Sequence, residues 1–314
     1  MKIAFAGTPR FGALVLGALI RSRHEIVLVM TQPDRPAGRG RELRMSPVKE
    51  LALQEGLRVE QPQSISSPEI IRLLHELGAQ ALTVAAFGQI LKQILLDAIP
   101  CINVHGSLLP KYRGAAPVER AIMNGEQKTG VSIMEITFKL DTGPVYLTRK
   151  VTIQAEDDAG AIYRKLGRAG GEALVETLDL MEAGELVAQP QDDSQATYVE
   201  KITQEDRMID WTRDSAQISA QVRALSPHIG AYTMANGQRL KMWRVKPVPP
   251  PAAATGNEPS AAPGSVIIDG ERLLVGTGSG LIEILEIQPE GKRRMVAAEF
   301  LRGYRWLIDG KTLV

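Results

Sequence analysis

The chain begins with MKIAFAGTPRFGALVLGALIRSRHEIVLVM over residues 1–30, and this stretch decides the fold. Ile3–Ala6 and Ile26–Met30 are short apolar runs of the kind that form buried strands. Between them, Phe11–Ile20 has the apolar spacing of a helix. A strand, a helix and a second strand in this order predict a parallel βαβ unit.

The same alternation continues through the first half of the chain. Ser67 and Pro68 open a helix, because serine suits the N-cap and proline the first helical position. Further strands are expected at 81–85, 102–105 and 131–136, and further helices at 47–54, 68–77 and 159–182. The sequence therefore predicts an α/β fold, with a Rossmann-like, doubly wound parallel sheet in a catalytic domain at residues 1–186.

The pattern changes after about Gly184. Residues 187–206 are polar and irregular, so we interpret them as a linker. Residues 207–314 hold short apolar runs, turn glycines and two helical patterns, which predict a smaller, OB-like β-barrel domain. In that domain, strands are expected at 231–234, 240–245, 265–268, 273–275 and 281–287, helices at 215–225 and 297–303, and an exposed Pro- and Ala-rich loop at 247–263.

Composition and charge limit the class of protein. Of 314 residues, 44% are hydrophobic and 23% charged, so sizeable cores are possible and wholesale disorder is excluded. The net charge of +1 excludes a polybasic protein, yet it is unevenly divided. Residues 1–206 carry 23 basic and 26 acidic side chains (−3), and residues 207–314 carry 14 and 10 (+4). The positive part suits a nucleic-acid surface, although ordinary charge scatter is the alternative.

Cysteine and histidine usage restricts the chemistry further. Cys101 is the single cysteine, which excludes an internal disulfide and a cysteine-based zinc cluster. The four histidines lack metal-ligand spacing, so we expect no metal. Polar residues 8–10 interrupt the first apolar run, and no stretch of about 18 apolar residues is present to span a membrane. We expect a soluble, cytoplasmic chain with no membrane partner.

Asn103 and His105 are the first candidate site residues. Residues two apart on a strand share a face, so both side chains project together while Val104 points into the core. The carboxyl ends of parallel strands bind ligands, and this pair falls at such an end. An amide beside an imidazole can stabilise an oxyanion and move a proton. The alternative is that both side chains only cap the strand.

Two turns accompany this pair. Ser107–Pro110 offers backbone amides and two leucines, which suit a flat heterocycle, whereas a Ser107–His105 nucleophile pair lacks a nucleophile elbow. Asp141, in Asp-Thr-Gly after the strand 131–136, is placed to pair with His105 and favour its charged form. Taken alone, Asp141 is equally consistent with an Asx turn.

Two glycine-containing loops remain. Residues 34–49 carry five basic and two acidic side chains and form a long connection, either a mobile binding element for phosphate or a solvated loop. Gly7–Gly12 occupies the first strand-to-helix turn but is not G-x-G-x-x-G, and no acidic residue ends the second strand. Dinucleotide binding is therefore disfavoured.

A family resemblance rests on five short stretches. Residues 103–110 (NVHGSLLP), 113–117 (RGAAP) and 140–143 (LDTG) resemble the 10-formyltetrahydrofolate-dependent formyltransferases. Residues 5–9 (FAGTP) and 31–40 (TQPDRPAGRG) resemble the branch that acts on methionyl-tRNA. Glycinamide ribonucleotide formyltransferases share the Asn-x-His and Asp signature but lack the arginine loop and the C-terminal domain. The resemblance covers nearly the whole chain, and Pro227–Gly230 is its main departure from the family pattern.

The resemblance implies a reaction and its residues. It implies formyl transfer from 10-formyltetrahydrofolate, a co-substrate, to the amine of initiator methionyl-tRNA for translation initiation. Catalysis then falls on Asn103, His105 and Asp141, folate binding on Ser107, Leu108, Leu109 and Pro110, and tRNA binding on Arg39 and Arg41. The charge of the C-terminal part adds six candidate tRNA contacts, Lys241, Arg244, Lys246, Lys292, Arg293 and Arg294.

Two other functions stay open. One is a formyltransferase for a nucleotide-sugar or another small amine, and the other is a non-catalytic folate- or RNA-binding protein. The presence of Asn103, His105 and Asp141 disfavours the non-catalytic protein. We expect a monomer.

Overall fold

The computed structural model describes residues 1–37, 42–248, 261–310 and 312–314. Contacts divide the chain into two compact units. The N-terminal unit comprises residues 1–117, 128–152 and 163–199, and the C-terminal unit comprises 118–127, 153–162 and 200–314. Arg39, Arg41 and residues 249–260 of the Pro- and Ala-rich stretch lie outside the described residues.

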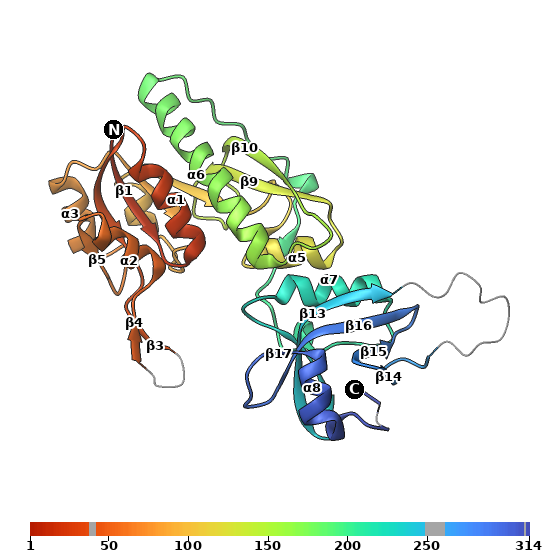
Figure 1. The fold of residues 1–314 in the computed structure, drawn as a ribbon. Helices are drawn as coiled ribbons and strands as arrows, with labels where there is room; N and C mark the ends of the chain where they lie inside the picture. Colours follow the sequence, from red (N-terminus) through yellow and green to blue (C-terminus); the bar gives the residue numbers. More distant parts are fainter. Residues whose placement is uncertain (38–41, 249–260, 311) are drawn as a thin grey trace. The chain divides into compact units, whose positions relative to one another are not determined.

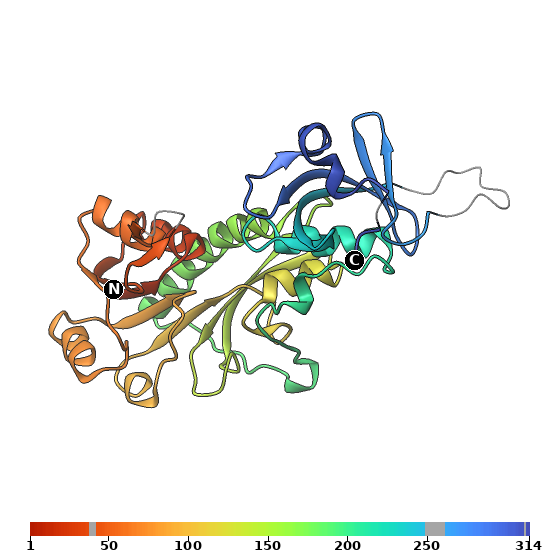
Figure 2. The same ribbon diagram turned by 90° about the horizontal axis from the view of Figure 1, so that it is seen from below.

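A seven-stranded sheet forms the N-terminal unit, in the order β10-β9-β7-β6-β1-β2-β5 (Figures 1 and 2). The five strands from β5 to β7 are parallel, as the βα alternation predicts. Their bounds are β1 (Lys2–Gly7), β2 (Glu25–Met30), β5 (Val59–Glu60), β6 (Ala81–Ala85) and β7 (Cys101–His105). The predicted Rossmann-like fold of this unit is confirmed.

Helices cover both faces of this sheet. α1 (Arg10–Ile20), α2 (Pro47–Gln54) and α6 (Ala159–Ala183) lie on one side, and α3 (Pro68–Glu76) and α4 (Gln93–Leu96) on the other (Figures 1 and 2). Alternate strand residues enter each layer: Ala4, Leu28 and Leu82 pack in one core with Ile70 and Leu74 of α3. The Ser67 hydroxyl accepts a hydrogen bond from the Ile70 amide, which is the N-cap that the sequence predicts.

The far edge of the sheet departs from the parallel pattern. β9 (Lys128–Glu135) pairs antiparallel with β7, and β10 (Val145–Thr152) pairs antiparallel with β9. The sequence analysis expected β9 but assigned it no direction, and it missed β10. This edge strand alternates exposed and half-buried residues, so it lacks the continuous apolar run that marks the inner strands.

Short pairings occur outside the main sheet. β3 (Arg35–Ala37) and β4 (Glu42–Arg44) form an antiparallel hairpin within residues 34–49, where the sequence analysis expected a loop. β8 (Arg113–Gly114) pairs with β11 (Tyr198–Val199) from the stretch interpreted as a linker. Two 3₁₀ turns, η1 (Asp193–Gln195) and η2 (Glu205–Arg207), also lie in that stretch.

The C-terminal unit is built on an antiparallel sheet in the order β12-β13-β16-β15-β14, with β17 paired to β16 (Figure 1). Its elements are α5 (Pro117–Met123), α7 (Ser215–Leu225), β12 (Ala231–Ala235), β13 (Gln238–Val248), β14 (Val266–Asp269), β15 (Arg272–Gly276), β16 (Leu281–Pro289), β17 (Met295–Val296), α8 (Ala297–Tyr304) and η3 (Arg305–Leu307). Trp211, Ile218, Leu240, Ile284 and Phe300 share its core.

The predicted β-rich C-terminal domain is therefore confirmed as a mostly antiparallel sheet. Within the described residues the edge strands β12 and β14 do not pair, so the sheet is not closed into a barrel. The register of the pairing between β13 and β16 shifts at two places next to Arg244. Bulges of this kind bend a strand, which suits the curved sheet of an OB-like fold.

In the part of the chain that the structure describes, no helix combines the length and apolar character needed to cross a bilayer.

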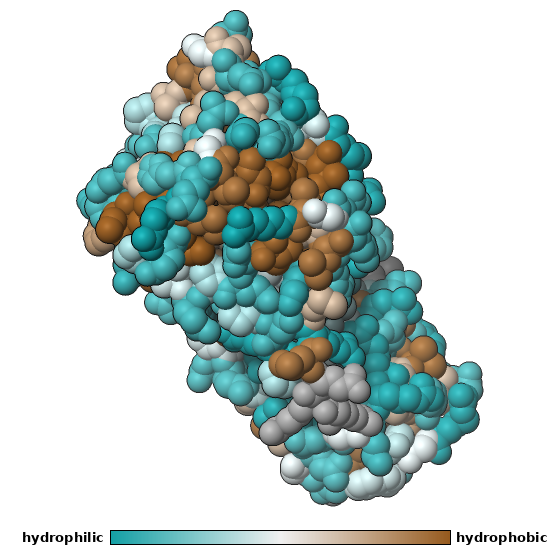
Figure 3. All heavy atoms as spheres, turned by 90° about the vertical axis from the view of Figure 1, so that its left-hand side faces the viewer, coloured by the Kyte–Doolittle hydropathy of each residue, from teal (hydrophilic) through white to brown (hydrophobic). Residues whose placement is uncertain are grey.

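Apolar side chains gather on one face of the N-terminal unit (Figure 3). Residues of α3 and α4, including Ile71 and Ile94, also line a shallow, open depression that does not include His105 or Asp141.

Candidate active site

β7 brings Asn103 and His105 to the carboxyl edge of the parallel strands. Val104 is buried in the core, while its two neighbours project together from the other side of the strand. β1, β6 and β7 run parallel as neighbours, so their carboxyl ends share this edge. β2 lies on one side of β1 and β6 on the other, so the order in which strands are added reverses at β1. In open α/β sheets, ligands bind at the carboxyl ends of the strands near such a switch point.

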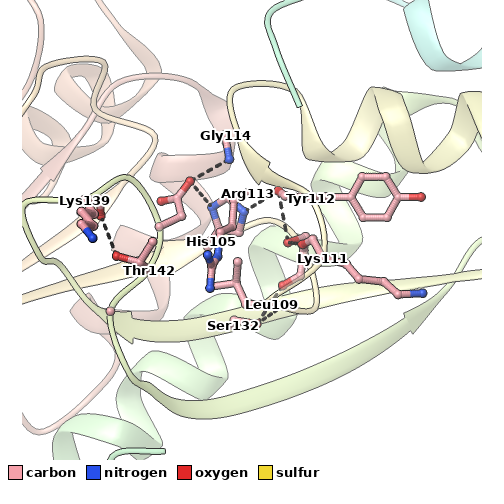
Figure 4. Close-up of polar contacts among 12 residues, drawn as sticks. His105, Leu109, Lys111, Tyr112, Arg113, Gly114, Ser132, Lys139 and Thr142 are labelled. Carbon is pink, nitrogen blue, oxygen red and sulfur yellow. Dashed lines mark hydrogen bonds and ion pairs between the residues drawn. The ribbon is translucent and has the colours of Figure 1, made fainter. Parts of the chain in front are cut away.

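His105 and Asp141 meet at this edge, and Figure 4 shows His105 beside Tyr112. His105 Nδ1 lies 3.7 Å from Asp141 Oδ2, and the two side chains are 6% and 12% exposed. His105 Nε2 lies 3.0 Å from the Tyr112 carbonyl oxygen, which can only accept a hydrogen bond. Nε2 therefore faces a hydrogen-bond acceptor, and Nδ1 faces the Asp141 carboxylate at ion-pair distance.

The loop that carries Asp141 reaches His105 by folding back. Because β9 is antiparallel, its end at Glu135 pairs with Ile102, about 10 Å along β7 from His105. Asp141 takes a φ of +51°, and its Oδ2 accepts a hydrogen bond of 2.8 Å from the Gly114 amide. Gly143 is required here, since a Cβ would lie 1.9 Å from the Glu135 carbonyl oxygen.

The predicted folate loop is held by internal hydrogen bonds. The buried Ser107 hydroxyl donates to the Lys111 carbonyl at 2.6 Å. The Ser132 hydroxyl of β9 accepts from the Leu109 amide at 3.0 Å (Figure 4). It also donates to the Ser107 carbonyl at 2.8 Å. Leu108, Leu109 and Pro110 stay half-buried, so they remain accessible for contact with a ligand.

Two further observations bear on the chemistry at this edge. Asn103 is half-buried, and among the described residues its side-chain amide has no hydrogen-bond partner. This side-chain amide is therefore available to a substrate oxygen. The Ser107 hydroxyl donates to a backbone carbonyl and not to His105, which disfavours a serine nucleophile. The site thus offers an amide, an imidazole and a carboxylate for polarising a carbonyl and moving a proton.

Comparison with known proteins identifies the family. The model of the formyl transferase family matches residues 1–178, and that of the formyl transferase C-terminal domain matches residues 201–305. The chain belongs to the formyl transferase family.

Similar relatives within the family include methionyl-tRNA formyltransferases. The chain is 45% identical to that of Symbiobacterium thermophilum, over 96% of this chain and 92% of the relative. It is 44% identical to that of Geobacter sulfurreducens, over 97% and 94% of the two chains. The predicted resemblance is confirmed: the chain is a member of this group of formyl transferases.

A solved structure shares the fold. HypX from Aquifex aeolicus, in complex with tetrahydrofolic acid, superposes with a TM-score of 0.65 at 20% identity. The match covers 96% of this chain and 48% of HypX, so this chain spans about half the length of that protein.

The candidate site also includes residues that were not selected from the sequence. Ser132 holds the predicted folate loop, and Gln191 donates hydrogen bonds to the Asp141 and Gly143 carbonyls. A polar residue on the strand facing Asn103–His105 was a usable signal for Ser132. Gln191 lies in the presumed linker, where no local pattern marks it.

The turn after β6 lies at the same edge of the sheet and was also missed. The Phe87 carbonyl accepts hydrogen bonds from Thr8 Oγ1 at 3.0 Å and Gln32 Nε2 at 3.3 Å. The Gln89 side chain accepts a hydrogen bond from the Ile65 amide and donates one to the Pro62 carbonyl. The neighbouring Ile90 is 89% exposed. An anchored turn with an exposed isoleucine therefore follows β6 at the carboxyl edge of the sheet.

Most predicted tRNA contacts in the C-terminal unit carry acidic partners. Arg244 and Arg294 approach Glu286 at 3.6 and 3.5 Å, and Arg293 pairs with Glu299. Lys246 faces Glu283 across the β13–β16 ladder, while Lys292 is exposed in the following turn. These pairs reduce the charge that those residues offer to a phosphate.

A different row of cations has no acidic side chain in ion-pair contact within the residues that the structure describes. Arg239 lies 4.6 Å and Arg207 5.8 Å from the Tyr232 ring centroid, and Lys241 lies 5.3 Å from that of Trp243. Burial, followed by the charges of Arg207 and Arg239, lowers the pKa of Lys241. We call Arg207, Arg239 and Lys241 the cation row. The spacing of Arg239 two residues before Lys241 was the signal that sequence reasoning overlooked.

One side-chain cluster has the spacing of a metal site. His24, Asp179 and Glu182 place ligand atoms within 4.8 Å of one another in the described part of the chain. Arg23 approaches Asp179 at 2.6 Å, and the Met1 amino group approaches Glu182 at 2.8 Å. Because cations already neutralise both carboxylates, we assign this cluster a structural role.

Proposed function

We propose that the protein transfers the formyl group of 10-formyltetrahydrofolate to the amino group of methionine on initiator methionyl-tRNA. The observation that carries this proposal is the match to methionyl-tRNA formyltransferases over nearly the full length of both chains. The meeting of His105 and Asp141 at the ligand-binding edge supports it independently.

The chemistry follows from the three polar side chains. The methionine amine attacks the formyl carbon, and the carbonyl oxygen becomes an oxyanion. Asn103 would donate to this oxyanion from its free amide, and His105 would donate after exchanging the Tyr112 carbonyl for the substrate. Asp141 would accept the amine proton, directly or through water. The C–N10 bond then breaks, and the folate nitrogen takes up a proton as tetrahydrofolate leaves.

The folate would lie against the loop Ser107–Pro110. Leu108 and Leu109 supply apolar contact for the pterin, and the Ser132 bridge keeps this loop in place. The turn carrying Ile90 supplies a second apolar surface at the same sheet edge. HypX, which shares the fold, was solved with tetrahydrofolic acid. We propose no metal in the reaction.

The tRNA would be bound through phosphates. We propose contacts from Arg39 and Arg41, which lie outside the described residues, and from the cation row of the C-terminal unit. Partly desolvated cations that have no acidic partner among the described residues gain most from an anion, because it relieves their mutual repulsion. Among the six earlier candidates, Lys241 is favoured, whereas Arg244, Lys246, Lys292, Arg293 and Arg294 are expected to contribute less.

The organisation of the chain remains part of the proposal. We propose a catalytic domain at residues 1–186, a linker at 187–206 and a tRNA-binding domain at 207–314, in a monomeric, cytoplasmic enzyme. Sedimentation equilibrium of the purified chain tests the monomer, which requires a single species near 34.2 kDa.

A comparison of acceptors tests the reaction. The protein is incubated with 10-formyltetrahydrofolate and either initiator methionyl-tRNA, uncharged tRNA or a nucleotide-linked amino sugar. We expect N-formylmethionine after hydrolysis of the charged tRNA and no product from the other two acceptors. Formylation of the amino sugar in place of methionine would establish the small-amine alternative, and no transfer at all would establish a non-catalytic protein.

A further inference from the structure

The segment Gln189–Val199 is hydrogen-bonded on two sides, to the strand that follows the Asp141 loop and to Arg113–Ala115, which follows the predicted folate loop. On one side, Val145 and Gln189 exchange backbone hydrogen bonds of 2.8 and 2.9 Å just after the Asp141 loop. On the other side, the Arg113 amide donates to Thr197 O at 2.8 Å and the Ala115 amide to Val199 O at 3.0 Å. The approach is close enough to demand glycine at 114, where a Cβ would lie 2.3 Å from Val199 O.

Gln191 uses its whole side-chain amide in this arrangement. Its Nε2 donates to the carbonyls of Asp141 at 2.9 Å and Gly143 at 2.7 Å. Its Oε1 accepts from Nε and Nη2 of Arg113 at 3.0 and 2.9 Å. Two donors and an acceptor are thus satisfied, which fixes the orientation of the amide.

Arg113 is itself immobilised. Its side chain is 1% exposed, and it also donates to Asp193 at 2.7 Å and to the Tyr198 hydroxyl at 2.8 Å. A buried guanidinium with this many partners has one orientation. Gln191 is therefore braced on a rigid group.

Asp141 needs such support because its backbone is unfavourable for a residue with a side chain. A φ of +51° lies in the left-handed region, which a residue with a Cβ keeps only where the surroundings impose it. Gln191 holds the carbonyl of Asp141 itself and that of Gly143. The Gly114 amide holds the carboxylate, directly after Arg113 in the chain.

We propose that Gln191 is a positioning residue of formyl transfer, which fixes the Asp141 carboxylate against His105. The proposal rests on the proposed function for its rate readout. It makes the segment before the C-terminal unit a part of the active site.

Two substitutions separate the parts of this role. Gln191→Glu keeps an acceptor for Arg113 but cannot donate to the two carbonyls, whereas Gln191→Leu loses both. Gln195→Leu is the matched control, because Gln195 is exposed in the same segment and, within the described part of the chain, its side chain bonds Asp192 alone. We expect Gln191→Glu to lower kcat by about 10- to 100-fold, since misplacement of about 1 Å has that effect, with the KM for folate within twofold. An unchanged kcat in Gln191→Glu would overturn the proposal.

A double substitution tests whether Gln191 acts through Asp141. In an Asp141→Asn background, Gln191→Glu is expected to change the residual rate by less than about threefold, because the carboxylate it positions is absent. A merely structural role would multiply the two losses, and a fully multiplicative result would contradict the proposal.

Hydrogen exchange provides a readout that does not depend on activity. The Gly114 amide is protected by Asp141 Oδ2, so its exchange reports the position of the carboxylate. Exchange at Gly114 is expected to accelerate in Gln191→Glu and in Asp141→Asn, and not in Gln195→Leu. Slow exchange in Gln191→Glu would refute the positioning role. An absence of formyl transfer in the parent protein would refute only the proposed function.

Discussion

Neutralising the cation row is expected to remove a defined part of the salt dependence of tRNA binding. The perturbation is the triple substitution Arg207→Gln, Arg239→Gln and Lys241→Gln. In the described part of the chain none of the three has an acidic side chain within 4.0 Å, so each is free to neutralise a phosphate. Each phosphate contact contributes a slope of about 0.7–0.9 in the log–log plot of affinity against salt.

The expected magnitude follows from three contacts. Their loss should flatten the slope by about 2–3, so the parent's drop in affinity between 50 and 200 mM salt should exceed the variant's by about 20- to 40-fold. Fluorescence anisotropy of labelled initiator tRNA, measured over that range, gives both slopes. The kcat at saturating tRNA and the KM for folate should stay near those of the parent.

The control removes the same charge from residues with acidic partners. Arg272, Arg302 and Arg305 pair with Glu283, Glu271 and Asp309, and changing all three to Gln leaves the cation row intact. Its salt slope should change by less than one. An unaltered slope in the cation-row variant, or an equal change in the control, would refute the assignment.

Three other predictions concern folate binding, pH and thiol chemistry. Ser132→Ala should raise the KM for 10-formyltetrahydrofolate several-fold and destabilise the protein by about 1–2 kcal/mol, because the Leu109 amide loses its partner; an unchanged KM would separate Ser132 from the folate loop. Burial lowers the pKa of His24, so the unfolded chain binds a proton more readily than the folded one, and the free energy of unfolding should fall as pH drops below about 6.5. Denaturant unfolding of His24→Gln should lack this loss. A full loss in the variant would contradict the explanation. Burial raises the pKa of Cys101 to about 12, so its thiol should not react with a disulfide reagent at pH 8 until guanidinium unfolds the protein, and rapid labelling of the native chain would contradict that burial.

The inner strands and most helices could be predicted because each carries its signal locally. Ala81–Ala85 is apolar except for Thr83, and Ser67-Pro68 provides both the cap and the first turn of α3. The helix at 215–225 was predicted with the observed bounds. Asn103 and His105 followed from strand alternation, a property of two neighbouring residues.

The remaining features depend on contacts that are distant in the sequence. The direction of β9 is set by its pairing with β7, and nothing within Lys128–Glu135 specifies it. β10 is an exposed edge whose alternation resembles that of a polar segment. Gln191 gains its importance from Arg113 and Asp141, 78 and 50 residues away.

The direct test of the central claim is the single-turnover rate of formyl transfer to initiator methionyl-tRNA in variants of the catalytic pair. His105→Ala and Asp141→Asn should each lower the rate by at least about 10²- to 10³-fold, while folate binding stays within twofold of the parent's. Because the two groups act together at 3.7 Å, the double variant should be scarcely slower than the slower single variant. A single variant that transfers at the parent's rate, or losses that multiply in the double variant, would contradict the account.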